Sequence, residues 1–220
     1  MRERFSVTNE KALYCRFHTQ TAGSTLTANQ IDNNVIRTTI QALSAVLGGT
    51  QSLHTNSRDE ALALPSEDAA ELALRTQQII ALESGITAYP DPFGGSYSIE
   101  ELTERFYNET MSIIKQIDDL GGAIEAIESG FIENEITRSA YEYQKQIEEK
   151  DKYVVGVNIH EKEESLEQDI HSIDSKLVSD QINNLRILKK KRDNLKVQDT
   201  LGELQKIAKN KDNIMPSIIN

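Results

Sequence analysis

The sequence is poor in cysteine, in basic residues and in long apolar runs. Its single cysteine, Cys15, excludes a disulfide framework within the chain and is typical of a protein in a reducing compartment. Acidic residues outnumber basic residues by 35 to 24, and the net charge of −11 argues against nucleic acid or an anionic membrane surface as a partner. No apolar stretch reaches the roughly 18 residues that indicate a transmembrane helix. We therefore expect a soluble, cytoplasmic protein that binds neither nucleic acid nor membrane.

Several common catalytic motifs are also missing. The sequence has no G-x-S-x-G nucleophile elbow, no H-E-x-x-H zinc motif and neither of the two glycine-rich phosphate-binding patterns. These absences disfavour a serine hydrolase, a zinc hydrolase and a nucleotide-binding protein of the P-loop or Rossmann type. A zinc site made by His18, His54 and Glu60 stays a minor alternative, because these residues lack a recognisable ligand spacing.

Hydrophobic periodicity predicts an α/β chain that ends in a charged, helical quarter. We expect strands at 12–24, 50–56 and 153–157, and helices at 29–47, 69–83, 100–120, 123–128, 132–150 and 179–209. The apolar stripe of the first helix is predicted to contain Ile31, Val35, Ile40, Leu43 and Leu47. Gly48-Gly49 should end that helix, and Ser66 should cap the next one. Cys15 lies in an apolar run and is expected to be buried, whereas His160 and His171 are expected at the surface.

Two polar clusters follow the first two predicted strands, and about one amphipathic helix separates them. His18 and Gln20 alternate with their neighbours and would share one face of a strand. Because successive β/α units present the carboxyl ends of their strands to a common site, we expect a polar ligand there. The amide of Asn56 and the carboxylate of Glu60 suit the paired hydroxyls of a ribose. Gly23 either allows a ligand close to the backbone or only makes a turn, and the histidine and glutamine could instead be satisfied by nearby backbone.

Longer motifs make the sequence similar to a known family. Segments 17–27, 33–38, 49–56 and 59–65 read FHTQTAGSTLT, NNVIRT, GTQSLHTN and DEALALP, and together they closely resemble the methylmalonyl-CoA mutase large-subunit family. Further matches are RTQ at 75–77, ESG at 83–85, DPFGGSY at 91–97, GG at 121–122, YEYQ at 141–144 and VGVN at 155–158. The resemblance is strong over residues 1–160 and looser beyond them.

The resemblance implies an isomerase that rearranges the carbon skeleton of an acyl-CoA, of the type that converts methylmalonyl-CoA to succinyl-CoA. Its cofactor would be adenosylcobalamin, a form of vitamin B12. By position in the family motifs, Gln20 and Gly23 would face the corrin ring. Asn56 and Glu60 would bind the adenosyl ribose, with Ala63 nearby.

The same resemblance implies that His18 and Ser52 contact the CoA part of the substrate. The tyrosine and histidine that are catalytic in the family have no matching segment here, so no residue is assigned a catalytic role, and none is assigned to a metal. The D-x-H-x-x-G motif of the cobalamin-binding domain does not occur either. A complete (β/α)8 (TIM) barrel needs about 250 residues. The resemblance therefore implies that residues 1–158 form the C-terminal portion of such a barrel, its last three or so βα units. Residues 159–220 would form a helical extension, without a cobalamin-binding domain.

Two functions follow from this assignment. In the first, the chain is part of an acyl-CoA mutase that acts with a chain supplying the first half of the barrel and with a cobalamin-binding subunit. In the alternative, the chain is an inactive remnant or interaction protein that keeps the half-barrel fold. The presence of Gln20, Asn56 and Glu60 favours the first function, because packing does not require all three. An unrelated barrel enzyme acting on sugar phosphates would rest on fold class alone.

Overall fold

The structure, a computed structural model, describes residues 2–162, 171–210 and 213–219. The chain divides into two compact units, Met1–His171 and Ser172–Asn220. The first unit contains both polar clusters of the sequence, and the described elements of the second unit are helices. The domain boundary predicted after residue 158 stays a prediction.

The first unit is rich in helix and has one small parallel sheet. Its elements are α1 (Arg2–Phe5), η1 (Glu10–Leu13), β1 (His18–Gln20), η2 (Gly23–Thr25), α2 (Asn33–Leu47), β2 (Ser52–His54), α3 (Glu67–Leu82), η3 (Ile86–Ala88), α4 (Tyr97–Asp119), α5 (Ala123–Glu128) and α6 (Phe131–Glu148). The order β1–α2–β2–α3 is that of two successive β/α units. The α/β class is therefore confirmed, while a partial TIM barrel stays a prediction.

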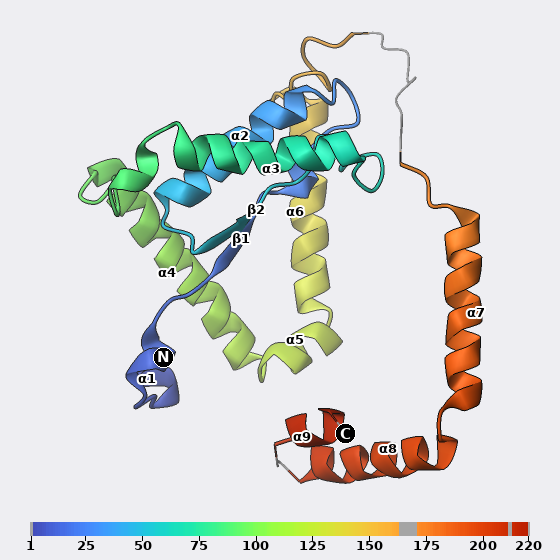
Figure 1. Ribbon diagram of the computed structural model, residues 1–220. Coiled ribbons are helices and arrows are strands. Elements are labelled where there is room, and N and C mark those ends of the chain that lie inside the picture. Colours follow the sequence, from blue (N-terminus) through green and yellow to red (C-terminus); the bar gives the residue numbers. More distant parts are fainter. Residues whose placement is uncertain (1, 163–170, 211–212, 220) are drawn as a thin grey trace. The chain divides into compact units, whose positions relative to one another are not determined.

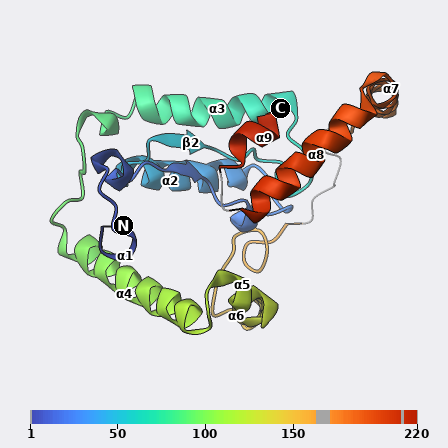
Figure 2. The ribbon, with the colours of Figure 1, turned by 90° about the horizontal axis from the view of Figure 1, so that it is seen from below.

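The two strands of the sheet have one covered face and one exposed face. They pair in parallel, and the opposite residues are His18 and Ser52, Thr19 and Leu53, and Gln20 and His54. The middle residue of each strand is half-buried, whereas the first and last residues are exposed. Figure 1 shows α2 and α3 on one side of the strands, and Figure 2 turns the unit so that the strands are seen from below. The exposed face is therefore the one that presents the polar side chains.

Small side chains allow α2 and α3 to approach the sheet and each other. The buried stripe of α2 is Asn34, Thr38 and Ala42, spaced by four residues. In α3 the buried residues are Ala69, Ala73, Thr76 and Ile80. Ile40, expected in the apolar stripe of α2, is 60% exposed. The helix ends are as predicted, because α2 stops before Gly48-Gly49 and the Ser66 side chain caps α3.

The segment before β1 differs from the prediction. The strand expected over 12–24 is reduced to His18–Gln20, and Glu10–Leu13 forms a 3-10 helix. Asn9 caps this helix by accepting a hydrogen bond from the Lys11 N–H at 3.0 Å. Cys15 lies between the 3-10 helix and the sheet and is exposed, so its predicted burial is wrong.

The strand predicted at 153–157 is also wrong. Val155 forms only an isolated bridge with Ile159, and Gly156 has a φ of +83°, which interrupts an extended run. The carbonyl of Val155 accepts from Arg37 Nη2 at 2.7 Å, and that of Gly156 accepts from Asn29 Nδ2 at 3.2 Å. Side chains from the first β/α unit thus donate hydrogen bonds to carbonyls that would otherwise pair with a neighbouring strand.

The second unit consists of α7 (Ser175–Lys191), α8 (Asn194–Lys209) and α9 (Met215–Ile219). The single helix predicted over 179–209 is two helices, because Asp193 begins a new one. Its carboxylate accepts from the N–H groups of Leu195 and Lys196 at 3.0 and 3.1 Å.

His160 and His171 are exposed, as predicted.

The described part of the chain buries few apolar side chains. They are Leu26, Ala42, Ala69, Ala73, Ile80 and Ala126. Larger apolar side chains such as Leu82 and Tyr97 are more than four-fifths exposed, at 81% and 88%. Among the described residues, no helix is long and apolar enough to span a membrane.

Candidate functional site

The carboxyl ends of β1 and β2 bring the two polar clusters into contact. Gln20 Nε2 donates to Asn56 Oδ1 at 3.0 Å. The N–H of Asn56 donates to Thr21 Oγ1 at 2.9 Å, and the N–H of Thr21 donates to the His54 carbonyl at 3.0 Å. Asn56 is only 2% exposed. Its side chain is therefore held in one orientation, with Oδ1 used by Gln20.

Gly23 completes a small cradle with Asn56 and Glu60. A Cβ atom on Gly23 would lie 2.9 Å from Asn56 Nδ2 and 3.5 Å from Glu60 Oε1, so only glycine fits here without displacing Asn56. Asn56 Nδ2 is buried and has no hydrogen-bond partner. An unsatisfied buried donor costs about 1–3 kcal/mol and calls for an explanation. The amide donor of Asn56 and the carboxylate acceptor of Glu60, next to the backbone of Gly23, could together hold a pair of ligand hydroxyls.

The turn that carries Glu60 is anchored by Asp59. Its carbonyl accepts from the Ala63 N–H at 3.1 Å, and its buried carboxylate accepts from the Ser66 N–H at 2.9 Å. Burial acts to raise the pKa of Asp59, but the Ser57 hydroxyl and Ser66 stabilise the carboxylate and hold the pKa below its ordinary value. Asp59 is therefore an anion that fixes this turn to the start of α3, while Glu60 remains exposed.

His18 and Ser52 lie at the other end of the exposed sheet face. They are direct neighbours across the two strands, with His18 Nδ1 and Ser52 Oγ 2.7 Å apart. Both residues are exposed. The pair can therefore hydrogen-bond a polar ligand group that lies along this face.

A hollow of about 190 Å³ opens between the end of β2 and α3. His54, Glu60 and Gln77 are among the residues that line it. Gln77 Nε2 donates to Thr55 Oγ1 at 3.0 Å, and that hydroxyl donates to the Ala73 carbonyl at 2.6 Å. Across the described ranges, no three or more histidine, cysteine, aspartate and glutamate residues are grouped so that they could hold a metal ion.

Sequence reasoning gave no role to three polar residues of α2, which hold the loops around the site. Asn34 is fully buried and bonds to both loops that follow the strands. Arg37 bonds to Thr27 Oγ1 at 3.0 Å, and Gln41 bonds to Thr25 Oγ1 at 2.7 Å. Spacing along a helix does not reveal such bonds, because their partners lie in loops.

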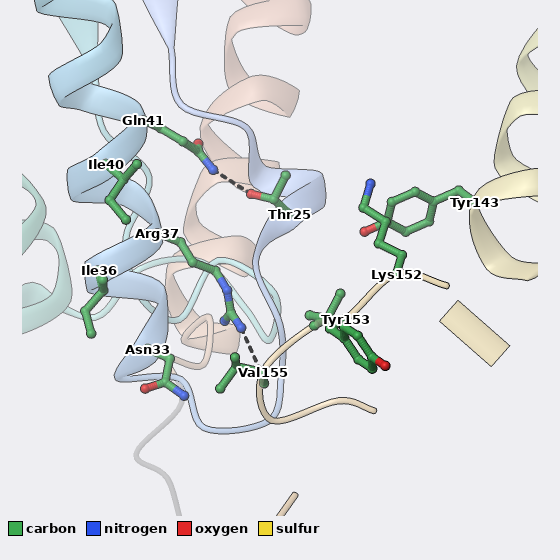
Figure 3. Close-up of a pocket in the computed structure, with 11 residues that line it drawn as sticks. Thr25, Asn33, Ile36, Arg37, Ile40, Gln41, Tyr143, Lys152, Tyr153 and Val155 are labelled. Carbon is green, nitrogen blue, oxygen red and sulfur yellow. Dashed lines mark hydrogen bonds between the residues drawn. The ribbon is translucent and has the colours of Figure 1, made fainter. Parts of the chain in front are cut away.

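A second hollow, of about 570 Å³, lies between α2 and the segment 152–155 (Figure 3). Ile36 and Ile40 form its apolar wall on α2, and Tyr153 lies across from them. Figure 3 shows the hydrogen bond of Gln41 to Thr25 on its edge. The loop after β1 is thus hydrogen-bonded to α2 through Thr25, while Gly23 in the same loop faces Asn56.

Comparison with known proteins identifies the class. The family described as methylmalonyl-CoA mutase matches residues 1–220. The chain is 46% identical over 221 residues to the 2-hydroxyisobutanoyl-CoA mutase large subunit of Aquincola tertiaricarbonis, covering 100% of this chain and 39% of that protein. It is 41% identical over 217 residues to the methylmalonyl-CoA mutase of Escherichia coli (strain K12), covering 98% and 30%. It is 40% identical over 209 residues to the mitochondrial methylmalonyl-CoA mutase of Homo sapiens, covering 94% and 28%.

The chain therefore belongs to the methylmalonyl-CoA mutase family, and the resemblance seen in its motifs is confirmed. These three relatives are named as mutases of an acyl-CoA. The chain spans between 28% and 39% of the length of these three relatives.

Proposed function

We propose that this chain is part of an adenosylcobalamin-dependent acyl-CoA mutase and supplies residues that face the cofactor. The observation that carries the proposal is the cradle of Gly23, Asn56 and Glu60 at the carboxyl ends of two parallel strands. The chain matches only a part of each relative, so the proposal requires further parts. We infer that these are a first half of a TIM barrel and a cobalamin-binding subunit.

The residues of the cradle fit the adenosyl group. Asn56 Nδ2 is a donor without a partner, and the Glu60 carboxylate can accept from a ribose hydroxyl. Gln20 occupies Asn56 Oδ1 and so keeps the amide N–H groups directed away from itself. We infer that Gly23, which lies against Asn56 and Glu60, also faces the corrin ring, and Ala63 lies in the turn that carries Glu60. Adenosylcobalamin, when bound, supplies the radical that starts a carbon-skeleton rearrangement.

The exposed sheet face suits the substrate. His18 and Ser52 form a hydrogen-bonded pair there, and we infer that they contact the CoA part of an acyl-CoA. The relatives' names give two candidate acyl groups, methylmalonyl and 2-hydroxyisobutanoyl. A cytoplasmic location remains our proposal from the single cysteine, although the human relative is named as mitochondrial.

The exposed apolar side chains support the need for partner chains. Leu82, Tyr97 and Tyr89 are 81%, 88% and 74% exposed. The two-stranded sheet is also smaller than an independently stable sheet, which usually has three or more strands. A barrel half from a second chain would cover such surface and extend the sheet.

Reconstitution tests the proposal. The chain is co-expressed with chains that supply the first barrel half and the cobalamin-binding domain. The purified complex is assayed for isomerisation of methylmalonyl-CoA and of 2-hydroxyisobutanoyl-CoA. We expect product only with adenosylcobalamin, and none from a complex carrying Asn56→Leu. A complex that assembles but isomerises neither acyl-CoA would instead support the inactive remnant or interaction protein.

A further inference from the structure

We propose that Gln41 is a positioning residue for the cofactor: from α2 it fixes the turn at Gly23, and thereby the cradle that Gly23 forms with Asn56 and Glu60. The cofactor part of this inference rests on the proposed function. The part that concerns the turn rests on hydrogen bonds within the described residues.

A single amide group holds both ends of the turn. Gln41 Oε1 accepts from the N–H of Ala22 at 2.6 Å. Gln41 Nε2 donates to Thr25 Oγ1 at 2.7 Å (Figure 3). The Thr25 hydroxyl donates in turn to the Ala22 carbonyl at 2.7 Å. Gly23 lies between these two anchored residues. The turn is therefore tied to α2 immediately before and shortly after Gly23.

The other side of the turn meets the cradle with little clearance. A Cβ on Gly23 would lie only 2.9 Å from Asn56 Nδ2, so Gly23 and Asn56 are close neighbours and a shift of the turn changes the space between them. Asn56 cannot follow freely, because Gln20 and Thr21 hold it. The spacing between Gly23 and Asn56 is thus set by bonds on both sides, and Gln41 supplies those on the α2 side.

The helix that carries Gln41 is a firm support. Ala42, the next residue, is fully buried, and the buried stripe of α2 continues through Thr38 to Asn34. Catalytic and binding groups keep their geometry best when rigid elements position them. Gln41 therefore acts through Gly23, without touching the cofactor itself.

Amide hydrogen exchange on the full 220-residue chain tests the hold on the turn. Gln41→Leu removes both bonds, whereas Gln41→Glu keeps an acceptor for the Ala22 N–H. We expect exchange at Ala22 to be about tenfold faster in the leucine variant and close to wild type in the glutamate variant. Gln144→Leu is the matched control, because Gln144 Nε2 donates to Glu148 Oε1 on the exposed surface of its own helix. An unchanged exchange rate at Ala22 in Gln41→Leu would show that Gln41 does not fix the turn at Gly23, whatever the function of the chain.

Cofactor affinity in the reconstituted complex tests the positioning role. We expect Gln41→Leu to raise the Kd for adenosylcobalamin about tenfold, and Gln41→Glu to restore most of the affinity. The melting temperature of the cofactor-free complex is measured alongside, because a purely structural glutamine would change only that quantity. Faster exchange with an unchanged Kd overturns the positioning role. A wild-type complex that does not bind adenosylcobalamin overturns both this role and the proposed function. The exchange data would still show whether Gln41 fixes the turn at Gly23.

Discussion

Replacing Asn34 by leucine removes a side chain that joins α2 to the loops after both strands. Asn34 is fully buried. Its Nδ2 donates to the carbonyls of Thr27 and Arg58, both at 2.8 Å. Its Oδ1 accepts from the Thr27 N–H at 3.1 Å and from Arg37 Nη1 at 2.8 Å. All four bonds are lost in Asn34→Leu, although leucine has a similar size.

The expected cost follows from the groups left behind. The N–H and carbonyl of Thr27 and the carbonyl of Arg58 lose a partner, and each buried unsatisfied group costs about 1–3 kcal/mol. Burying a leucine side chain returns about 1.5–3 kcal/mol. We therefore expect Asn34→Leu to lower the free energy of unfolding by about 4 kcal/mol, against a typical total of about 5–15 kcal/mol. Asn34→Asp keeps both acceptor bonds, but its second oxygen faces the carbonyls of Thr27 and Arg58, so this variant should also be less stable than wild type.

Urea unfolding followed by tyrosine fluorescence measures this loss. The chain has 7 tyrosines and no tryptophan, and every tyrosine lies within Met1–His171, so the signal reports on the first unit alone. Asn33→Ala is the matched control. The Asn33 side chain is only half-buried and donates to Gln30 Oε1 at 3.0 Å, so we expect less than about 1 kcal/mol. The reasoning is refuted if Asn34→Leu costs no more than Asn33→Ala.

Three further changes have definite expected outcomes. Gly23→Ala places a Cβ 2.9 Å from Asn56 Nδ2, so thermal unfolding should show a loss of about 1–3 kcal/mol, and adenosylcobalamin should bind more weakly to the complex. Arg37→Met removes the bond from Arg37 to the segment after Lys152, so trypsin should cleave at Lys152 faster than in wild type; equal rates would contradict this. The pKa of Asp59 is lower in the folded chain than in the unfolded chain, so its stabilising contribution is present above about pH 4 and is lost as the pH falls through the folded pKa. Asp59→Asn should therefore be less stable than wild type at pH 7, with a smaller difference at pH 3 by urea unfolding.

Local sequence signals predicted the elements near the site well. The glycine pair after Leu47 and the cap at Ser66 mark real helix ends, because these signals act through the backbone of their own helix. Alternation also placed His18 and Gln20 on one exposed strand face. The helix predicted at 123–128 has the bounds that the structure shows.

Contacts between distant segments could not be predicted in this way. The run 153–157 has strand-like residues, yet two of its carbonyls accept hydrogen bonds from the Arg37 and Asn29 side chains. The residues of the run itself give no sign of these bonds. The buried stripe of α2 also differs from the predicted apolar stripe, because contacts with distant segments determine it. Its buried face includes Asn34, which bonds to Thr27 and Arg58 in the loops after the strands and to Arg37 on α2, whereas Ile40 is mostly exposed.

The central claim is that Asn56 and Glu60 hold the adenosyl ribose, and one binding comparison tests it most directly. The Kd for adenosylcobalamin and the Kd for hydroxocobalamin, which lacks the adenosyl group, are measured for the wild-type complex and for complexes carrying Glu60→Ala or Asn56→Leu. We expect each variant to raise the Kd for adenosylcobalamin about tenfold or more, and to leave the Kd for hydroxocobalamin unchanged. An equal loss for both cobalamins, or no loss for either, would contradict the account.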